Sequence, residues 1–117
     1  MLGGGIPAGT VERGIALGVD IIAIDGGSTD SGPHYLGTAT AKTARSAVAR
    51  DLQAVVPAAA AAGIPVVIGS CGTAGTDAGV DWVHDCASRV STASRTPTTS
   101  KRCASRIGFT RSNPRAP

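Results

Sequence analysis

Aromatic side chains are scarce in this sequence of 117 residues, which contains one Trp, one Tyr and one Phe. A hydrophobic core must therefore be built from Ala, Val, Ile and Leu. A surface that stacks nucleic-acid bases on interleaved aromatic rings is not expected either. Glycine is abundant, at 16 residues, which indicates many tight turns between short regular elements.

Metal-binding and secretory patterns are also missing. The three cysteines form no Cys-x-x-Cys pair, and the two histidines are not placed to complete a metal cage. The N-terminus lacks the basic and apolar regions of a signal peptide. The longest apolar stretch, residues 55–69, is shorter than the ~20 residues that span a bilayer. We therefore expect a cytoplasmic protein with reduced thiols and no membrane partner.

Acidic residues stop at Asp85. Residues 1–85 hold all eight acidic residues and four basic ones, a net charge of −4, whereas residues 86–117 hold seven basic residues and no acidic one. The second segment is dominated by Ser, Thr, Arg and Ala and shows no regular apolar period. Such a segment cannot bury enough apolar surface to offset chain entropy. The sequence therefore predicts a partial α/β domain over residues 1–85 and a disordered basic tail over residues 86–117.

Three interpretations of the tail remain open. A nucleic-acid-binding arm would be attracted to phosphates by its charge, but the tail lacks interleaved aromatics and repeated motifs, so a nucleic-acid partner is not expected. The tail could instead be inert and solvated. We favour a third interpretation, in which a shifted reading frame in GC-rich DNA replaced the natural continuation. The helical pattern that begins near Asp77 is abandoned, acidic residues vanish, and residues with GC-rich codons (Arg, Ser, Ala, Thr and Pro) take over.

The pattern along residues 1–85 alternates between helix and strand. Thr10 is a predicted N-cap, Gly63 a predicted helix end, and Pro57 is expected to kink or divide the longest helix. The predicted apolar stripe of that helix is Ala44, Val48, Leu52, Val55 and Ala59, and its charged residues, Asp51 among them, are expected mostly off this stripe. Continuous apolar runs predict strands that are buried on both faces. The order and the short connections predict an α/β fold with a partial parallel sheet and Rossmann-like layers. The expected elements are a helix over 11–18, a strand over 20–25, a helix within 38–63, a strand over 64–69 and a helix from about 76.

Unusual loops follow both predicted strands. The first reads DGGSTDSGPHYLG over residues 25–37, and the second reads GSCGTAGTD over residues 69–77. Ligands bind outside the carboxyl ends of the strands in such sheets, so the two loops are placed for a shared site. The candidate ligand-binding residues are Gly27, Ser28, Thr29, Tyr35, Gly69, Ser70, Gly72, Gly75 and Asp77.

Three residues of the first loop are candidates for catalysis, namely Asp25, Asp30 and His34. Two carboxylates facing one pocket would repel each other, which favours a bound divalent cation of unspecified identity or one raised pKa. Each residue also has a plainer interpretation. Asp25 can accept hydrogen bonds from amides in the Gly-Gly turn, and a lone histidine is more often structural.

The second loop offers backbone N–H groups at the start of a helix, which attract a phosphate or a carboxylate. Its spacing is G-x-x-G-x-x-G rather than G-x-G-x-x-G, so the pattern indicates a dinucleotide only weakly. The same glycines also fit a turn that needs positive φ angles. We therefore expect a small-molecule anion as the ligand. Cys71 is expected to be a small residue that lines this loop. The oligomeric state is left open.

The joined motif GSTDSGPHYLG and the later GIPVVIGSCGTAGTD resemble the N-terminal part of the acyclic terpene utilisation (AtuA-type) family, over about residues 2–85. The resemblance implies an N-terminal fragment of an α/β protein associated with bacterial breakdown of branched, terpene-like carboxylic compounds, with an undefined reaction. It also implies a strand before Met1 and a helix that continues through Cys86. The motif positions carried over are Asp25, Gly27, Ser28, Thr29, Asp30, Gly32, Pro33, Tyr35, Gly37, Gly69, Ser70, Gly72, Gly75 and Asp77.

Two other hypotheses about the function of the chain remain open. DGGST after a strand is similar to the phosphate loop of actin-like ATPases and sugar kinases, where a hairpin strand normally follows. Here Pro33 intervenes and a helical pattern begins near Thr40, so this hypothesis ranks second. The chain could also be a truncated product without function, and whether it is an enzyme is left open.

Overall fold

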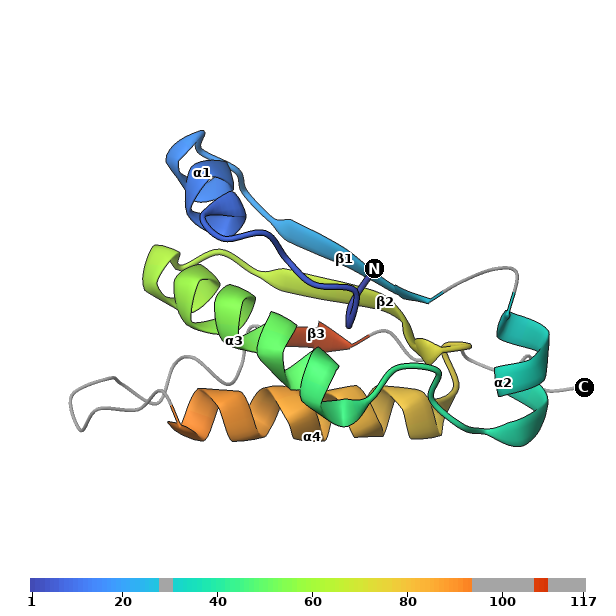
Figure 1. The fold of residues 1–117 in the computed structure, drawn as a ribbon. Coiled ribbons are helices and arrows are strands. Elements are labelled where there is room, and N and C mark those ends of the chain that lie inside the picture. Colours follow the sequence, from blue (N-terminus) through green and yellow to red (C-terminus); the bar gives the residue numbers. More distant parts are fainter. Residues whose placement is uncertain (28–30, 94–106, 110–117) are drawn as a thin grey trace, which may run out of the picture.

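The computed structural model describes residues 1–27, 31–93 and 107–109. β1 and β2 pair in parallel and are joined through α2 and α3, and β2 pairs in parallel with β3 (Figure 1). The predicted α/β class with a parallel sheet is therefore confirmed. The elements are α1 (Thr10–Ala16), β1 (Ile22–Gly27), α2 (Gly32–Thr38), α3 (Arg45–Ala62), β2 (Val66–Thr73), α4 (Asp77–Ala93) and β3 (Ile107–Phe109).

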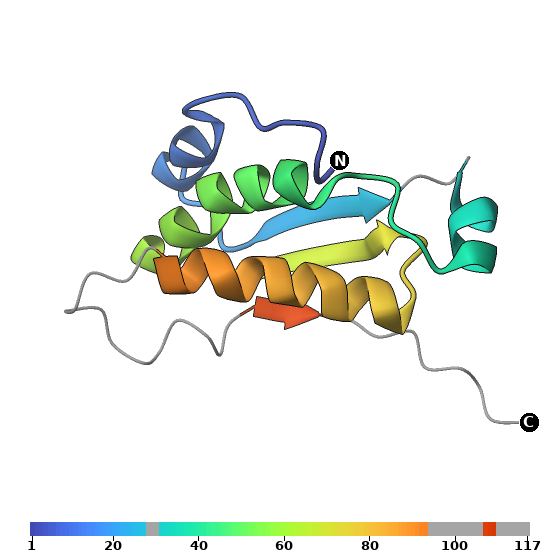
Figure 2. The same cartoon turned by 60° about the horizontal axis from the view of Figure 1, so that its bottom comes forward.

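α3 and α4 lie on the same face of the sheet (Figure 2). Val66 and Ile68 of β2 are buried, and their register partners Ile22 and Ile24 in β1 are half-buried. The alternate residues point to the opposite face, where Ala23 is exposed. The prediction of strands buried on both faces is therefore wrong for the described residues. The continuous apolar sequences of β1 and β2 belong to a sheet that helices cover on one face in the described residues.

The core lies between the sheet and the inner faces of α3 and α4. The predicted apolar stripe of α3 is confirmed at Val48, Leu52, Val55 and Ala59, whereas its first predicted member, Ala44, is exposed. The buried cluster consists of Leu2, Val48, Leu52, Val55, Val56, Ala59, Val66, Ile68, Cys71, Val80, Val83, Cys86, Ala87 and Val90.

The two longer helices begin and end differently from their predictions. α3 starts at Arg45 rather than at residue 38, where the helical pattern began, and residues 32–38 form the separate helix α2. Pro57 lies inside α3 without dividing it, although it removes one backbone hydrogen bond. Buried Val55, Val56 and Ala59 pack into the core on both sides of this proline, and their burial offsets the loss. Within the described ranges, no helix combines the length and apolar character needed to cross a bilayer.

α1 occupies nearly the predicted range, but its predicted N-cap is wrong. Gly9 holds the cap position with a φ of +73°, and no side chain accepts a hydrogen bond there. Thr10 is already the first helical residue, and its hydroxyl Oγ1 accepts a hydrogen bond from Arg13 at 3.3 Å. A glycine with left-handed backbone therefore makes the turn that a threonine cap was expected to make.

Asp51 in α3 is a charged residue that the sequence pattern predicted to be exposed and that the structure buries. Its charge predicted a position off the apolar stripe, yet the residue is 1% exposed. The carboxylate oxygen Oδ2 accepts hydrogen bonds from the N–H groups of Gly3 at 2.7 Å and Gly5 at 3.1 Å, and Oδ1 lies 3.4 Å from the Arg50 guanidinium. The buried charge is therefore satisfied by the N-terminal segment rather than by solvent.

The predicted disorder from residue 86 is wrong for residues 86–93, because α4 continues to Ala93. Cys86, Ala87 and Val90 are buried in the core. A second part of the predicted tail, Ile107–Phe109, forms strand β3. The remaining tail residues lie outside the described ranges. The helix is not abandoned at residue 86, which removes one of the observations behind the frame-shift hypothesis. The change in charge and composition after Asp85 is unaffected.

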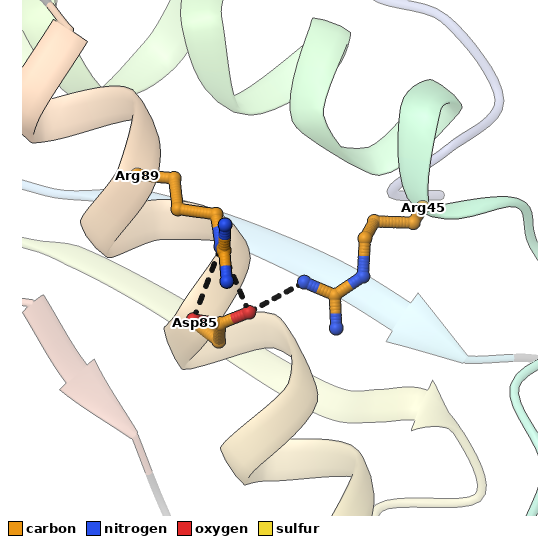
Figure 3. Close-up of polar contacts among 3 residues, drawn as sticks. All are labelled: Arg45, Asp85 and Arg89. Atoms are coloured by element: carbon orange, nitrogen blue, oxygen red, sulfur yellow. Dashed lines mark hydrogen bonds and ion pairs between the residues drawn. The ribbon is translucent and has the colours of Figure 1, made fainter.

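A three-residue ion cluster joins α3 to α4 on their outer side (Figure 3). The Asp85 carboxylate accepts a hydrogen bond from Arg45 at 2.5 Å and, one turn along the same helix, from Arg89 at 3.1 Å. The Arg45 guanidinium also lies 5.6 Å from the centre of the Trp82 ring. These contacts fix the start of α3 against the middle of α4. Their energetic contribution is modest because the side chains are 44–75% exposed.

The Val90→Ala variant tests whether α4 beyond residue 85 belongs to the folded core. Val90 is 3% exposed, so its truncation should lower the free energy of unfolding by about 1–3 kcal/mol. Urea denaturation followed by circular dichroism measures the change. Gln53→Ala, at an exposed position of α3, is the matched control and should be nearly neutral. A neutral Val90→Ala would support a disordered segment from residue 86 instead.

The Asp85 cluster makes stability depend on pH. Hydrogen bonds from Arg45, and then from Arg89, hold the pKa of Asp85 below its ordinary value of 3.8. A carboxylate with a lowered pKa stabilises the fold above its unfolded pKa, and that contribution is lost as the pH falls through the folded pKa. Between about pH 5 and pH 2, Asp85→Asn should therefore lose less stability than the wild type in urea titrations. Asp20→Asn, at an exposed position, should keep the wild-type profile.

Candidate functional site

The carboxyl ends of β1 and β2 meet at one edge of the sheet, as predicted. The parallel register aligns Asp25 with Gly69 and then, after an irregularity, Gly27 with Thr73. β2 therefore advances four residues while β1 advances two. The extra residues of β2 bend its end across the end of β1. The two loops singled out in the sequence thus arise from neighbouring strand ends.

Glycine is required where these ends touch. A Cβ atom at Gly26 would lie 2.8 Å from the carbonyl oxygen of Gly69, and one at Gly27 would lie 2.7 Å from that of Thr73 and overlap the Cβ of Ser70. Both glycines are buried. No larger residue leaves room for this approach of two backbones. Gly27 was predicted as a ligand-binding residue, and the structure assigns it a packing role.

The end of β2 has an unusual backbone. Ser70 and Thr73 are not glycines, yet their φ angles are +50° and +86°. A positive φ is a genuine outlier for a β-branched residue such as Thr73, which is only 4% exposed. Gly72 and Gly75 adopt positive φ as the turn interpretation of the glycines predicted. Backbone strain of this kind clusters at functional sites, and the surrounding packing must hold it in place.

Asp25 lies at the end of β1 with an exposed side chain. Its Oδ1 accepts a hydrogen bond from the N–H of Gly27 at 2.9 Å, which is the local turn that the plainer interpretation predicted. The other predicted members of this loop, Ser28, Thr29 and Asp30, lie outside the described residues. Within the described residues, no group of three or more His, Cys, Asp or Glu side chains is placed to hold a metal ion.

His34 and Tyr35 lie on α2, a short helix that the sequence pattern did not predict. Their rings meet edge to face with centroids 5.0 Å apart. His34 is exposed and Tyr35 is half-exposed. Ser31, just before α2, accepts a hydrogen bond from the Lys42 ammonium at 3.0 Å. The Pro33 at the start of α2 was a usable signal, because proline is favoured in the first helical turn.

α4 begins at this edge of the sheet, with Asp77 as its first residue. Thr76 caps it, because its Oγ1 accepts a hydrogen bond from the N–H of Gly79 at 3.1 Å. Asp77 is exposed in the first turn, where a negative charge is stabilised by the helix dipole. Gly72 packs closely on Gly79, since a Cβ atom added at Gly72 would lie 3.0 Å from the Cα of Gly79. The second loop and the start of α4 are therefore one packed unit.

Cys71, which the sequence suggested as a small residue lining the second loop, is part of the hydrophobic core. It is 2% exposed, and its Sγ lies 3.6 Å from the carbonyl oxygen of Ile68. Burial raises the pKa of its thiol, so the protonated form persists at neutral pH. Burial likewise raises the pKa of Cys86. Neither described cysteine has the exposed, electropositive environment of a reactive thiolate.

The Gly27→Ala variant tests the contact between the strand ends. A methyl group there must push Ser70 and Thr73 away, which should lower the free energy of unfolding by about 1–3 kcal/mol. Thermal and urea unfolding measure the effect. Gly14→Ala in α1 is the matched control, because nothing lies within 4 Å of its added Cβ. The control should be neutral or stabilising by up to about 1 kcal/mol; equal effects in the two variants would contradict the contact.

Comparisons with known proteins give no relative from which a role could be transferred. No family model matches the chain, and neither a curated protein nor a solved structure matches it. The functional interpretation therefore depends on the residues of this site: two packed strand ends, a strained turn, and the start of a long helix at the same edge of a parallel sheet.

Proposed function

We propose that the chain binds a small anionic molecule at the carboxyl ends of β1 and β2. The observation that supports this most is the packing of Gly26 and Gly27 against the strained end of β2, which brings both predicted loops and the start of α4 together. In parallel sheets this edge is where ligands bind. We propose the same location for the branched-acid ligand that the resemblance to the acyclic terpene utilisation family implies.

The chemistry of the edge suits a carboxylate or phosphate. The start of α4, a helix of 17 residues, carries partial positive charge. Asp25 keeps one carboxylate oxygen beyond its bond to Gly27, and a divalent cation on that oxygen would join it to an anionic ligand. Asp30 is the proposed second carboxylate of this cation site, and His34 the proposed acid or base. The remaining proposed contacts are Ser28, Thr29, Tyr35, Gly69, Ser70, Gly72, Gly75 and Asp77.

The rival phosphate-loop hypothesis expects a hairpin strand after the first loop. In the described residues the loop is followed by α2 and α3, and the next strand, β2, runs parallel to β1. Nothing in this geometry favours that hypothesis, so we retain the anion-binding proposal alone. We also retain, as a proposal, a cytoplasmic role in the metabolism of branched carboxylic compounds, with the reaction undefined.

Asp25→Asn tests the proposed site without removing the turn, because an asparagine oxygen can still accept from Gly27. Binding of isovalerate, a small branched carboxylate, is measured by calorimetry with MgCl₂ and again with EDTA. We expect Asp25→Asn and EDTA each to weaken binding about tenfold, or about 1.4 kcal/mol. Asp20→Asn is the matched control, because it removes the same charge from an exposed residue at the opposite end of β1.

The outcomes separate the parts of this proposal. Wild-type protein that folds but binds neither isovalerate nor inorganic phosphate would contradict an anion site. Binding that is unaffected by Asp25→Asn would remove Asp25 from the site. Binding that depends on Asp25 but survives EDTA would remove the cation.

A further inference from the structure

Lys42 lies in the linker between α2 and α3, which runs past the carboxyl edge of the sheet (Figure 1 and Figure 2). Its ammonium donates a hydrogen bond to the hydroxyl of Ser31, a residue of the first candidate loop, at 3.0 Å. Its neighbour Thr43 packs on the N-terminal segment, since a Cβ atom added at Gly3 would lie 2.9 Å from the Cβ of Thr43. The residue before Gly3 donates a hydrogen bond to the carbonyl of Asp25. The linker is therefore held near the end of β1, and the ammonium is held at the loop that follows it.

Lys42 has no carboxylate partner among the described residues. Three of the five basic side chains in the described ranges lie beside a carboxylate, namely Arg45, Arg50 and Arg89. The other two, Lys42 and Arg13, donate to hydroxyl groups instead. Arg13 belongs to α1, which lies near the start of β1 rather than at its end (Figure 1). Lys42 is therefore the described cation that combines contact with a candidate loop and a charge that no described carboxylate balances.

An anion at this edge of the sheet needs a positive charge, because the described residues there are acidic. Asp25 and Asp77 both have exposed side chains. The start of α4 contributes the equivalent of about half a positive charge. Asp77 places a full negative charge in that first turn, which more than offsets this contribution. The attraction of a carboxylate ligand to the edge therefore depends on the Lys42 ammonium rather than on the helix alone.

We propose that Lys42 is a specificity-determining residue of the anion site and that Ser31 positions its ammonium. The inference rests on the proposed function and names the group that selects a carboxylate over a neutral analogue of the same shape. A lysine ammonium has three N–H donors. Lys42 can therefore keep its hydrogen bond to Ser31 and still donate to the oxygens of a bound carboxylate.

Lys42→Gln tests the role of the charge, because glutamine is also a hydrogen-bond donor but is neutral. Calorimetry on the full chain compares isovalerate with isovaleramide, its neutral amide. The wild type should prefer isovalerate about tenfold, and Lys42→Gln should lose this preference by weakening isovalerate binding alone. The loss should be the same in MgCl₂ and in EDTA, which separates it from the proposed divalent cation. Lys42→Arg keeps the charge and should keep the preference.

Arg13→Gln is the matched control, because it removes the same charge from an exposed side chain that also donates to a hydroxyl. It should bind both compounds as the wild type does. Ser31→Ala tests the positioning role, since it removes the acceptor and leaves the charge in place. It should narrow the preference for isovalerate without changing isovaleramide binding. Circular dichroism verifies that each variant is folded.

The outcomes distinguish this inference from the proposed function. Isovalerate binding by the wild type together with an unchanged preference in folded Lys42→Gln would overturn the role of Lys42 and leave the anion site in place. Equal losses in Lys42→Gln and Arg13→Gln would indicate an effect of net charge and would also overturn it. Wild-type protein that binds neither isovalerate nor inorganic phosphate would overturn the proposed function and this inference together.

Discussion

The carboxylate of Asp51 connects three parts of the structure that would otherwise be independent. A charge with 1% exposure is costly unless hydrogen bonds satisfy it, and here the N–H groups of Gly3 and Gly5 do so. The bond fixes the N-terminal segment against α3. That segment places Leu2 in the core and its N–H on the carbonyl of Asp25, at the end of β1. The need to satisfy the buried charge of Asp51 therefore links α3, the N-terminal segment and the end of β1 at the candidate site.

Helices on one side of the sheet make the remaining core contacts important. In the described residues, helices cover one face of β1 and β2, so the buried apolar side chains come from that face of the sheet, from the inner faces of α3 and α4 and from the N-terminal segment. The last turns of α4 supply Cys86, Ala87 and Val90 to this limited core. In a chain of this size few buried residues can be lost without unfolding. The ion cluster of Arg45, Asp85 and Arg89 adds alignment rather than much energy.

The sequence predicted the features that depend on the periodicity of apolar residues and on the positions of turn-forming residues. The stripe of α3, the order of elements and the meeting of the two loops follow from apolar spacing and from glycines after strands. The end of α4 was predictable as well, since Val80, Val83, Ala87 and Val90 keep helical spacing, but the Ser- and Arg-rich composition around them outweighed this signal. Composition describes the average of a segment, whereas burial needs only one face of a helix.

Features set by tertiary contact could not be predicted in this way. Asp51 is a residue type typical of surfaces, and only the approach of Gly3 and Gly5, nearly fifty positions earlier, makes it a core residue. The positive φ of Thr73 likewise contradicts its local preference and persists because the ends of β1 and β2 are packed together. Each feature has a local energetic cost, burial of a charge at Asp51 and backbone strain at Thr73, and long-range contacts offset that cost. They lie at the two ends of one series of contacts. The Asp51 carboxylate holds the N-terminal segment, Leu2 of that segment donates to the carbonyl of Asp25, and β1 then packs through Gly27 against Thr73.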